Sequence, residues 1–193
     1  EAGQGLFTAM CQIAAEELGV PLEDVEISRA DTDLTTFCLG AFASRLTYVS
    51  GNAVKDASAK VKQQLFETAA EMLEARADDL VCREGRIFVQ EAEHKSVTVA
   101  DVARTRLFRR GGSPIVASGS FDADSMIQDK SRYGNESGAY NFGCQAAEVE
   151  VDPDTGQVKV LKYVVASDCG TVINPTGAEG QVAGERIKAD AGG

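Results

Sequence analysis

The sequence predicts an α+β fold in which helices pack on antiparallel or mixed sheets. Two features carry this prediction: a long apolar stripe at helical spacing in the first half of the chain, and a strand pair joined by a turn in the second half. Helical spacing puts apolar side chains on one face every three or four residues, whereas alternation puts them on one face of a strand. Elements of both kinds that bury one face each give an α+β arrangement.

The first predicted element is a helix over residues 7–18. Its apolar residues recur at three- and four-residue intervals, and Gly19 and Pro21 follow as stop signals. We expect residues 25–28 to form a short strand. Residues 31–42, which are rich in Asp, Thr and Gly, are expected to form a loop.

The strongest helical pattern covers residues 44–76. Its apolar stripe is interrupted only at Ser50-Gly51-Asn52. A glycine inside a helix costs about 1 kcal/mol relative to alanine. Gly51 therefore indicates the close approach of another backbone or of a ligand.

Residues 80–103 predict a hairpin followed by a short helix. Two apolar runs flank Glu84-Gly85, and Thr98 is placed to cap the helix that follows. Residues 114–121 are expected to form a further strand.

The clearest strand pair lies late in the chain. Residues 147–151 alternate apolar and acidic side chains, which predicts one buried face and one solvated face. A turn at residues 152–156 follows, in which Pro sets φ and Gly accepts a positive φ. Residues 158–166 return as the partner strand, and a helix is expected to begin near residues 176–179.

Composition argues against several classes of function. The net charge of -11 opposes binding to nucleic acid or to an anionic membrane surface. No apolar run approaches the roughly 20 residues of a membrane helix. The five cysteines are widely spaced with no CxxC, so we expect reduced thiols in a cytoplasmic protein. The single His94 lies among charged residues, so the sequence predicts no metal ligands and no catalytic residue.

Three places rich in Gly, Ser or Gln, each beside an expected helix, are candidate binding elements. Gly3-Gln4-Gly5 precede the first helix, whose N-terminal N–H groups favour an anionic group. Gly40-Ala41-Phe42-Ala43-Ser44-Arg45 lead into the long helix, with Ser44 as a candidate cap and Arg45 as a permanently charged side chain. Gly180-Gln181 is the third. Taken alone, the first is more often an ordinary turn, the second a capped helix with a surface Arg, and the third a surface loop.

Short motifs spread along the chain form an ordered set. They are Glu1-Ala2-Gly3-Gln4-Gly5, residues 12–19, Asp31-Thr32-Asp33, Ala43-Ser44-Arg45, residues 50–54, residues 147–152, Thr155-Gly156, Asp168-Cys169-Gly170, Ile173-Asn174-Pro175 and Glu179-Gly180-Gln181. Each motif is modest, but the ordered set is specific. In these motifs the chain resembles the molybdopterin-binding large subunit of the xanthine dehydrogenase, aldehyde oxidase and 4-hydroxybenzoyl-CoA reductase family.

This resemblance implies a molybdenum-pyranopterin cofactor, either molybdopterin or its dinucleotide form. It also implies hydroxylation by water, or the reductive counterpart, at molybdenum. The residues that the resemblance places at the cofactor are Gly3, Gln4, Gly5, Ala43, Ser44, Arg45 and Gln181.

The resemblance further implies that the chain is a fragment. The family's Gly-Val-Gly-Glu-Pro segment, which carries a basic Glu, does not occur in this sequence. Residues 1–193 are therefore expected to be part of a molybdopterin-binding domain, truncated at both ends and inactive alone. The implied partners are the remaining segments of the large subunit and separate iron–sulfur and FAD subunits or domains. Without these partners, apolar surface that they would cover is left exposed, so we expect the chain to self-associate into an oligomer.

Two rival interpretations stay open on the sequence. The chain could be a structural or assembly module that keeps the fold without a cofactor, or a general anion-binding domain that uses residues 3–5. Within the family, residues 43–45 and 50–52 look closer to bacterial aromatic acyl-CoA reductases or dehydrogenases than to animal purine oxidases.

Overall fold

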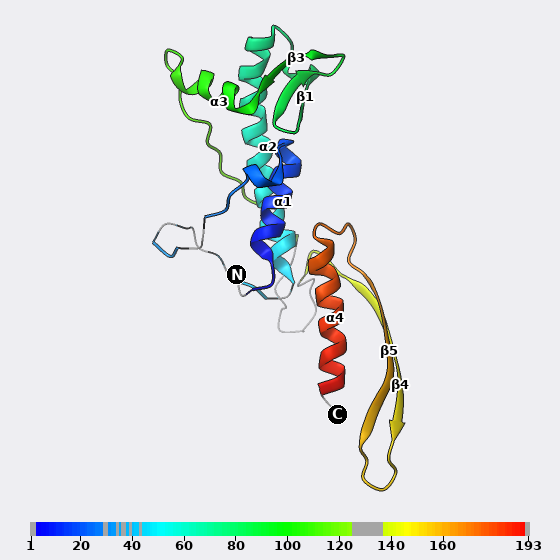
Figure 1. Cartoon of the computed structure of the whole chain (residues 1–193). Coiled ribbons are helices and arrows are strands. Elements are labelled where there is room, and N and C mark those ends of the chain that lie inside the picture. The colour runs from blue at the N-terminus through cyan, green and yellow to red at the C-terminus, as the bar shows by residue number, and fades with distance from the viewer. Residues whose placement is uncertain are drawn as a thin grey trace. The chain divides into compact units, whose positions relative to one another are not determined.

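The computed structural model consists of two compact units, residues 1–124 and residues 125–193 (Figure 1). It describes residues 3–28, 31–33, 35, 38, 40–42, 44–124 and 137–191, without the side chains of residues 185–191. The elements are α1 (Leu6–Leu18), η1 (Leu22–Asp24), α2 (Arg45–Leu73), η2 (Ala77–Asp79), β1 (Leu80–Arg83), β2 (Arg86–Val89), β3 (Ala92–Thr98), α3 (Val99–Phe108), β4 (Phe142–Val151), β5 (Val158–Asp168) and α4 (Pro175–Ala191). Both sheets are antiparallel, so the α+β prediction is confirmed.

Helices α1 and α2 pack side by side with the same direction. A Cβ added to Gly51 of α2 would lie 2.9 Å from Ile13 Cδ1 of α1. Further along both helices, Lys62 Nζ donates a hydrogen bond of 2.8 Å to the carbonyl of Glu17. Residue numbers rise together along the pair, so both N-termini lie at the same end (Figure 1). The group that lies close to Gly51 is thus the Ile13 side chain of α1. The prediction that another backbone or a ligand lies there was wrong.

The three-stranded sheet has the order β1-β2-β3. Glu84 and Gly85 have φ values of 49° and 70°, as a two-residue type I′ hairpin turn requires, which confirms the predicted hairpin. The Thr98 side chain accepts a hydrogen bond from the Asp101 N–H, which confirms the predicted cap of α3. Strand β3 was not predicted, because its first half is polar and exposed and only pairing with β2 makes it a strand.

The core of the first unit lies where α2, α3 and this sheet meet. Partly buried apolar side chains from α2, the sheet and Ile115 surround it. Its buried members are Leu65, Ala69, Leu80, Ile87 and Val102.

Two predicted strands of the first unit were wrong. Residues 25–28 and residues 114–121 have no β-ladder partner. The second segment still alternates half-buried and exposed residues from Ile115 to Phe121, as an extended chain does. Its neighbour is helix α2 instead of a strand, so side chains of that helix meet its backbone polar groups.

The second unit contains the hairpin β4–β5 and helix α4. The turn between the strands forms as predicted: Gly156 has a φ of 72°, and the Asp152 carboxylate accepts hydrogen bonds from the N–H groups of Asp154 and Thr155. Helix α4 begins at Pro175, with the Asn174 side chain accepting a hydrogen bond from the Gly177 N–H at 3.0 Å.

The predicted burial of one hairpin face was wrong. Every residue of β4 is exposed, and no residue of β5 is fully buried. The alternation itself is present: register places Val149 opposite Val160 on one face and Glu150 opposite Lys159 on the other. A two-stranded hairpin buries a face only when another layer covers it. In the described part of this unit α4 contacts β5, but it fully buries no residue of the hairpin.

Candidate functional site

The first candidate element is the N-terminal end of α1. Gly3 and Gly5 have φ values of 90° and 79°, which side-chain-bearing residues rarely adopt. Among the described residues, a Cβ added to either would meet nothing within 4 Å. Gly5 precedes the helix without a capping side chain. Gln4 between the two glycines is exposed.

The second element is the N-terminal end of α2. Ser44 has a left-handed backbone with φ of 52° and makes no side-chain cap, so the predicted Ser44 cap was wrong. A capping serine normally has an extended backbone that turns its hydroxyl toward the first turn. Ala43 lies outside the described residues.

Arg45 is half-buried and bends back over its own loop. Its Nη1 donates to the Gly40 carbonyl at 3.1 Å, and its guanidinium lies 5.2 Å from the centre of the Phe42 ring. Among the described residues no carboxylate pairs with Arg45. Gly40 and Phe42 belong to the candidate segment of residues 40–45, but the sequence did not predict that they contact the Arg45 side chain.

The parallel packing of α1 and α2 brings these two elements to one end of the first unit. Each helix start carries a partial positive charge, and Arg45 adds a full one. This arrangement favours an anionic group, and no described residue lies within 4 Å of a Cβ built on Gly3, Gly5 or Gly40.

The third candidate, Gln181, lies in the second unit. It is exposed and sits inside α4, which begins six residues earlier. Gly180-Gln181 therefore do not form a turn, and the helix expected to begin near residues 176–179 is confirmed. Glycine is a common turn residue that helices nonetheless tolerate.

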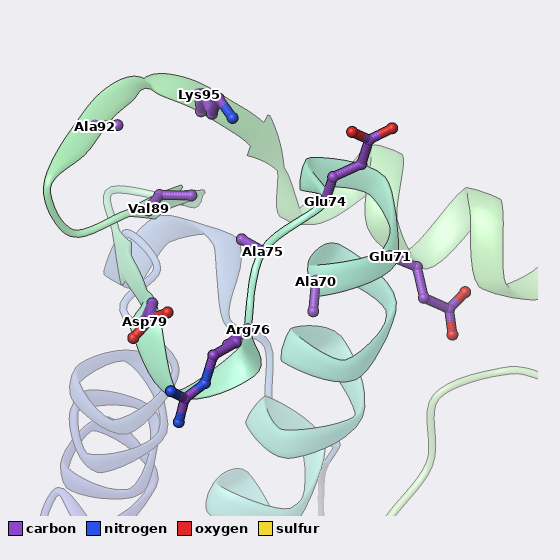
Figure 2. Close-up of a pocket in the computed structure, with 9 residues that line it drawn as sticks. All are labelled: Ala70, Glu71, Glu74, Ala75, Arg76, Asp79, Val89, Ala92 and Lys95. Atoms are coloured by element: carbon purple, nitrogen blue, oxygen red, sulfur yellow. The ribbon is translucent and has the colours of Figure 1, made fainter.

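A hollow at the opposite end of α2 has a different character. Its lining mixes charges of both signs, including Glu71, Glu74, Arg76, Asp79 and Lys95 (Figure 2). In the described part of the chain, no three His, Cys, Asp or Glu side chains gather as a metal ion would require. This hollow is separate from the end of α2 that bears Arg45.

Comparison with known proteins identifies the class of protein. Residues 1–187 match the molybdopterin cofactor-binding domain family. The chain is 34% identical over 182 residues to the nicotine 6-hydroxylase large subunit of Paenarthrobacter nicotinovorans, covering 94% of this chain and 22% of that protein. It is 35% identical over 188 residues to the xanthine dehydrogenase molybdenum-binding subunit of Escherichia coli O157:H7, covering 95% of this chain and 23% of that protein.

Solved structures agree with this result. The Cu,Mo-CO dehydrogenase in its carbon monoxide-reduced state is similar with a TM-score of 0.79 and 32% identity, over 95% of this chain and 22% of that one. Quinoline 2-oxidoreductase from Pseudomonas putida 86 gives a TM-score of 0.78 and 31% identity, with the same coverage. The chain belongs to the molybdopterin cofactor-binding domain family, which confirms the resemblance found in its motifs. It spans about a fifth of the length of these relatives.

In the part of the chain that the structure describes, no helix has both the length and the apolar character of a membrane span.

Proposed function

We propose that this chain forms one wall of the molybdenum-cofactor site in a larger oxidoreductase subunit. The observation that carries the proposal is the shared end of α1 and α2 in a chain of the molybdopterin cofactor-binding family: the glycine turn lies at this end together with Arg45, which has no carboxylate partner among the described residues. Residues 1–193 are then part of a molybdopterin-binding domain that other segments of the subunit complete.

The residues present fit an anionic pterin cofactor. The turn at Gly3, Gln4 and Gly5 allows a flat group to approach the backbone, and the Gln4 amide can both donate and accept hydrogen bonds. We assign Ala43, Ser44 and Arg45 to the binding of the phosphate or pterin, with the guanidinium of Arg45 as the forked donor. Gln181 contributes from α4. When bound, the molybdenum centre supplies the redox chemistry, and this chain supplies binding and orientation.

The catalytic base and the electron-transfer partners are proposed to lie elsewhere. Several relatives are named as one subunit or chain of a larger enzyme, such as the gamma subunit of the 6-hydroxypseudooxynicotine dehydrogenase complex. We propose that iron–sulfur and FAD modules serve the subunit that contains this chain, in the cytoplasm. Assays of that subunit should include purines, other nitrogen heterocycles, aldehydes and 4-hydroxybenzoyl-CoA. The aldehydes test the resemblance to aldehyde oxidases, and 4-hydroxybenzoyl-CoA tests the resemblance to acyl-CoA reductases; both resemblances were inferred from the motifs.

Arg45→Ala in the complete subunit is expected to lower its content of molybdenum and pterin. A hydrogen bond to a charged group contributes about 1.5–3 kcal/mol, which corresponds to roughly 10- to 100-fold weaker binding when it is lost. Metal analysis and pterin fluorescence of the purified protein measure the loss. Arg83→Ala is the matched control, because Arg83 also stacks on an aromatic ring, that of Phe88, at 5.7 Å.

Unchanged cofactor content in Arg45→Ala would remove Arg45 from the site. No molybdenum in the unaltered subunit would sink the proposed function and favour the rival structural module without a cofactor.

The isolated chain is expected to self-associate through the apolar face of β4–β5. Val149, Val151, Val158 and Leu161 are all exposed on this hairpin. The measurement is light scattering over a range of protein concentrations. The double variant Val151→Glu with Val158→Lys keeps the net charge and should shift the chain toward monomer. A reversed pair on the opposite face, Glu150→Lys with Lys159→Glu, should leave association unchanged; a monodisperse unaltered monomer would contradict this prediction.

A further inference from the structure

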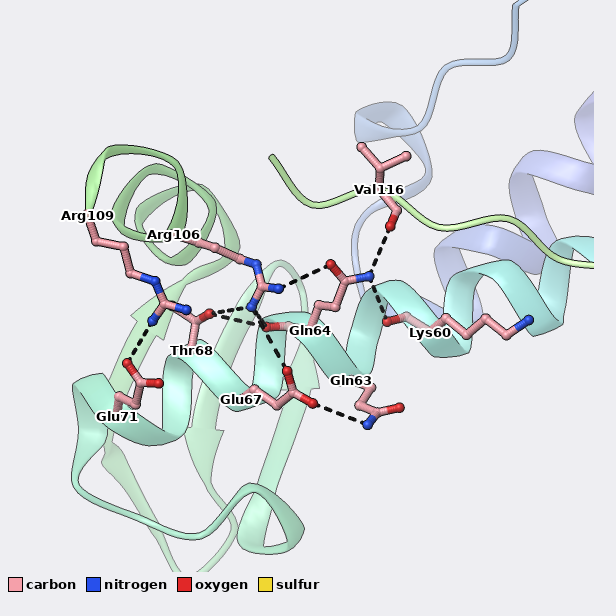
Figure 3. A network of polar contacts seen from close by, with 9 residues as sticks. All are labelled: Lys60, Gln63, Gln64, Glu67, Thr68, Glu71, Arg106, Arg109 and Val116. Atoms are coloured by element: carbon pink, nitrogen blue, oxygen red, sulfur yellow. Dashed lines mark hydrogen bonds and ion pairs between the residues drawn. The ribbon is translucent and has the colours of Figure 1, made fainter. Parts of the chain in front are cut away.

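A strap, defined as residues 115–121, runs beside α2 and is held to it by polar side chains. Asp56 Oδ2 accepts a hydrogen bond from the Ser120 N–H at 3.1 Å. Lys60 Nζ donates to the Ser118 carbonyl at 3.2 Å. A third residue of the same helix, Gln64, donates from Nε2 to the Val116 carbonyl at 3.0 Å (Figure 3). The strap therefore runs antiparallel to the helix.

These three contacts have a common spacing. The helix residues lie four apart and advance about 6 Å per step, at 1.5 Å per residue. The strap residues lie two apart and advance about 6.6 Å per step in an extended chain. Because the rise over four helix residues nearly equals the rise over two strap residues, one face of α2 contacts the backbone of every second strap residue, three times in succession.

The strap also lies very close to the helix backbone. A Cβ added to Gly119 would lie 2.1 Å from the Ala53 carbonyl oxygen and 2.5 Å from the Ala57 nitrogen. Only glycine fits there, so the strap cannot slide by one residue without a clash. Gly119 and the three polar contacts together fix the register of the strap.

Each contact on α2 is supported by a neighbour. Lys60 Nζ also lies 2.7 Å from Asp56 Oδ2, and Lys60 together with the Ser120 N–H holds the pKa of the Asp56 carboxyl below its usual value. The Gln64 side-chain oxygen accepts from Arg106 Nη2 at 3.4 Å, and the Gln64 amide nitrogen remains aimed at the strap (Figure 3).

The fixed register brings Phe121 to the end of α2 that bears Arg45. The Phe121 ring packs edge-on against Tyr48, with 5.3 Å between ring centres. Tyr48 is three residues after Arg45, and residues three apart share a helix face.

We propose that the strap is a positioning device for the cofactor end of the first unit, with Asp56, Lys60 and Gln64 as positioning residues that act through Phe121 and Tyr48. This inference rests on the proposed function. It assigns a role in cofactor retention to residues that lie up to five helical turns from Arg45.

The test compares two substitutions of Asp56 in the complete subunit. Asp56→Ala removes the acceptor for the Ser120 N–H, whereas Asp56→Asn keeps an oxygen there. We expect Ser120 to lose protection from amide exchange in Asp56→Ala and to keep it in Asp56→Asn. Release of molybdenum and pterin should be about two- to tenfold faster in Asp56→Ala, the range that one aromatic contact provides, and near the unaltered rate in Asp56→Asn.

Two further variants separate positioning from general stability. Phe121→Ala should accelerate cofactor release while the Ser120 N–H stays protected from exchange. The substitution removes the contact between Phe121 and Tyr48 but leaves the register of the strap intact. Arg109→Ala removes an ion pair of 2.8 Å to Glu71 at the other end of α2 and should leave release unchanged.

The outcomes are distinguishable. Loss of Ser120 protection in Asp56→Ala with unchanged cofactor release would overturn the positioning role and leave the proposed function standing. Equal acceleration in Arg109→Ala would also overturn it, since the effect would then follow stability alone. An unaltered subunit without molybdenum would overturn the proposed function and this inference together.

Discussion

Gly19→Ala is expected to destabilise the first unit by about 2–5 kcal/mol. Gly19 ends α1 with a φ of 74°, and a left-handed backbone costs a side-chain-bearing residue about 1–2 kcal/mol. A Cβ there would lie 2.2 Å from the Cys82 carbonyl oxygen, and relieving such an overlap adds about 1–3 kcal/mol. Chemical denaturation followed by circular dichroism measures the loss.

The clash matters because Gly19 joins α1 to the sheet. Its carbonyl accepts hydrogen bonds from the Gly85 N–H at 3.0 Å and from the Cys82 thiol at 3.4 Å. Burial raises the pKa of the Cys82 thiol, so the thiol keeps the proton that it donates. Displacing residue 19 therefore disturbs the hairpin turn as well as the helix end.

Gly111→Ala is the matched control for the effect of backbone conformation. Gly111 has a φ of 73°, nearly that of Gly19, but a Cβ there would meet nothing within 4 Å. Gly111→Ala should lower the free energy of unfolding only by the cost of a left-handed backbone, about 1–2 kcal/mol. Equal losses in the two variants would mean that the contact with Cys82 adds nothing.

The second large effect is expected for Ile87→Ala, at about 2–5 kcal/mol. Ile87 of β2 is 0% exposed and packs in the core with Leu65, Ala69, Leu80 and Val102. Truncating a buried side chain loses its transfer free energy and leaves a cavity that a packed core fills poorly. Denaturation, together with amide exchange in β1 to β3, reports the loss. Ile87→Val, which removes one methyl group, should cost about 0.5–1.5 kcal/mol.

Phe108→Ala tests whether burial decides this effect. Phe108 is larger than Ile87 but is 78% exposed at the end of α3, so its truncation should change stability by less than about 0.5 kcal/mol. A cost similar to that of Ile87→Ala would show that Phe108 is covered in solution.

Local patterns predicted most of the regular elements. The bounds of α1 and α2, the type I′ turn at Glu84-Gly85 and the Thr98 cap follow from spacing and from turn and cap residues, because these interactions join neighbours in the chain. Three of the errors have one cause. The strap alternates like a strand but lies against a helix, β3 becomes a strand only beside β2, and the apolar face of β4–β5 is left exposed by the described residues. Each of these outcomes depends on which element of the fold packs against the segment, and a short sequence pattern does not specify that element.

The candidate site divides in the same way. Sequence motifs alone identify the family and the chemical character of two binding elements, the glycine turn at residues 3–5 and the charged Arg45. The packing of the helices places both elements at one end of the first unit, because Gly51 accommodates Ile13 and the two helices pack in parallel. The tertiary structure also placed Gln181 inside a helix and Phe121 against Tyr48. The chemistry of each side chain follows from its residue type. Which distant residues lie close together depends on how the helices and the strap pack.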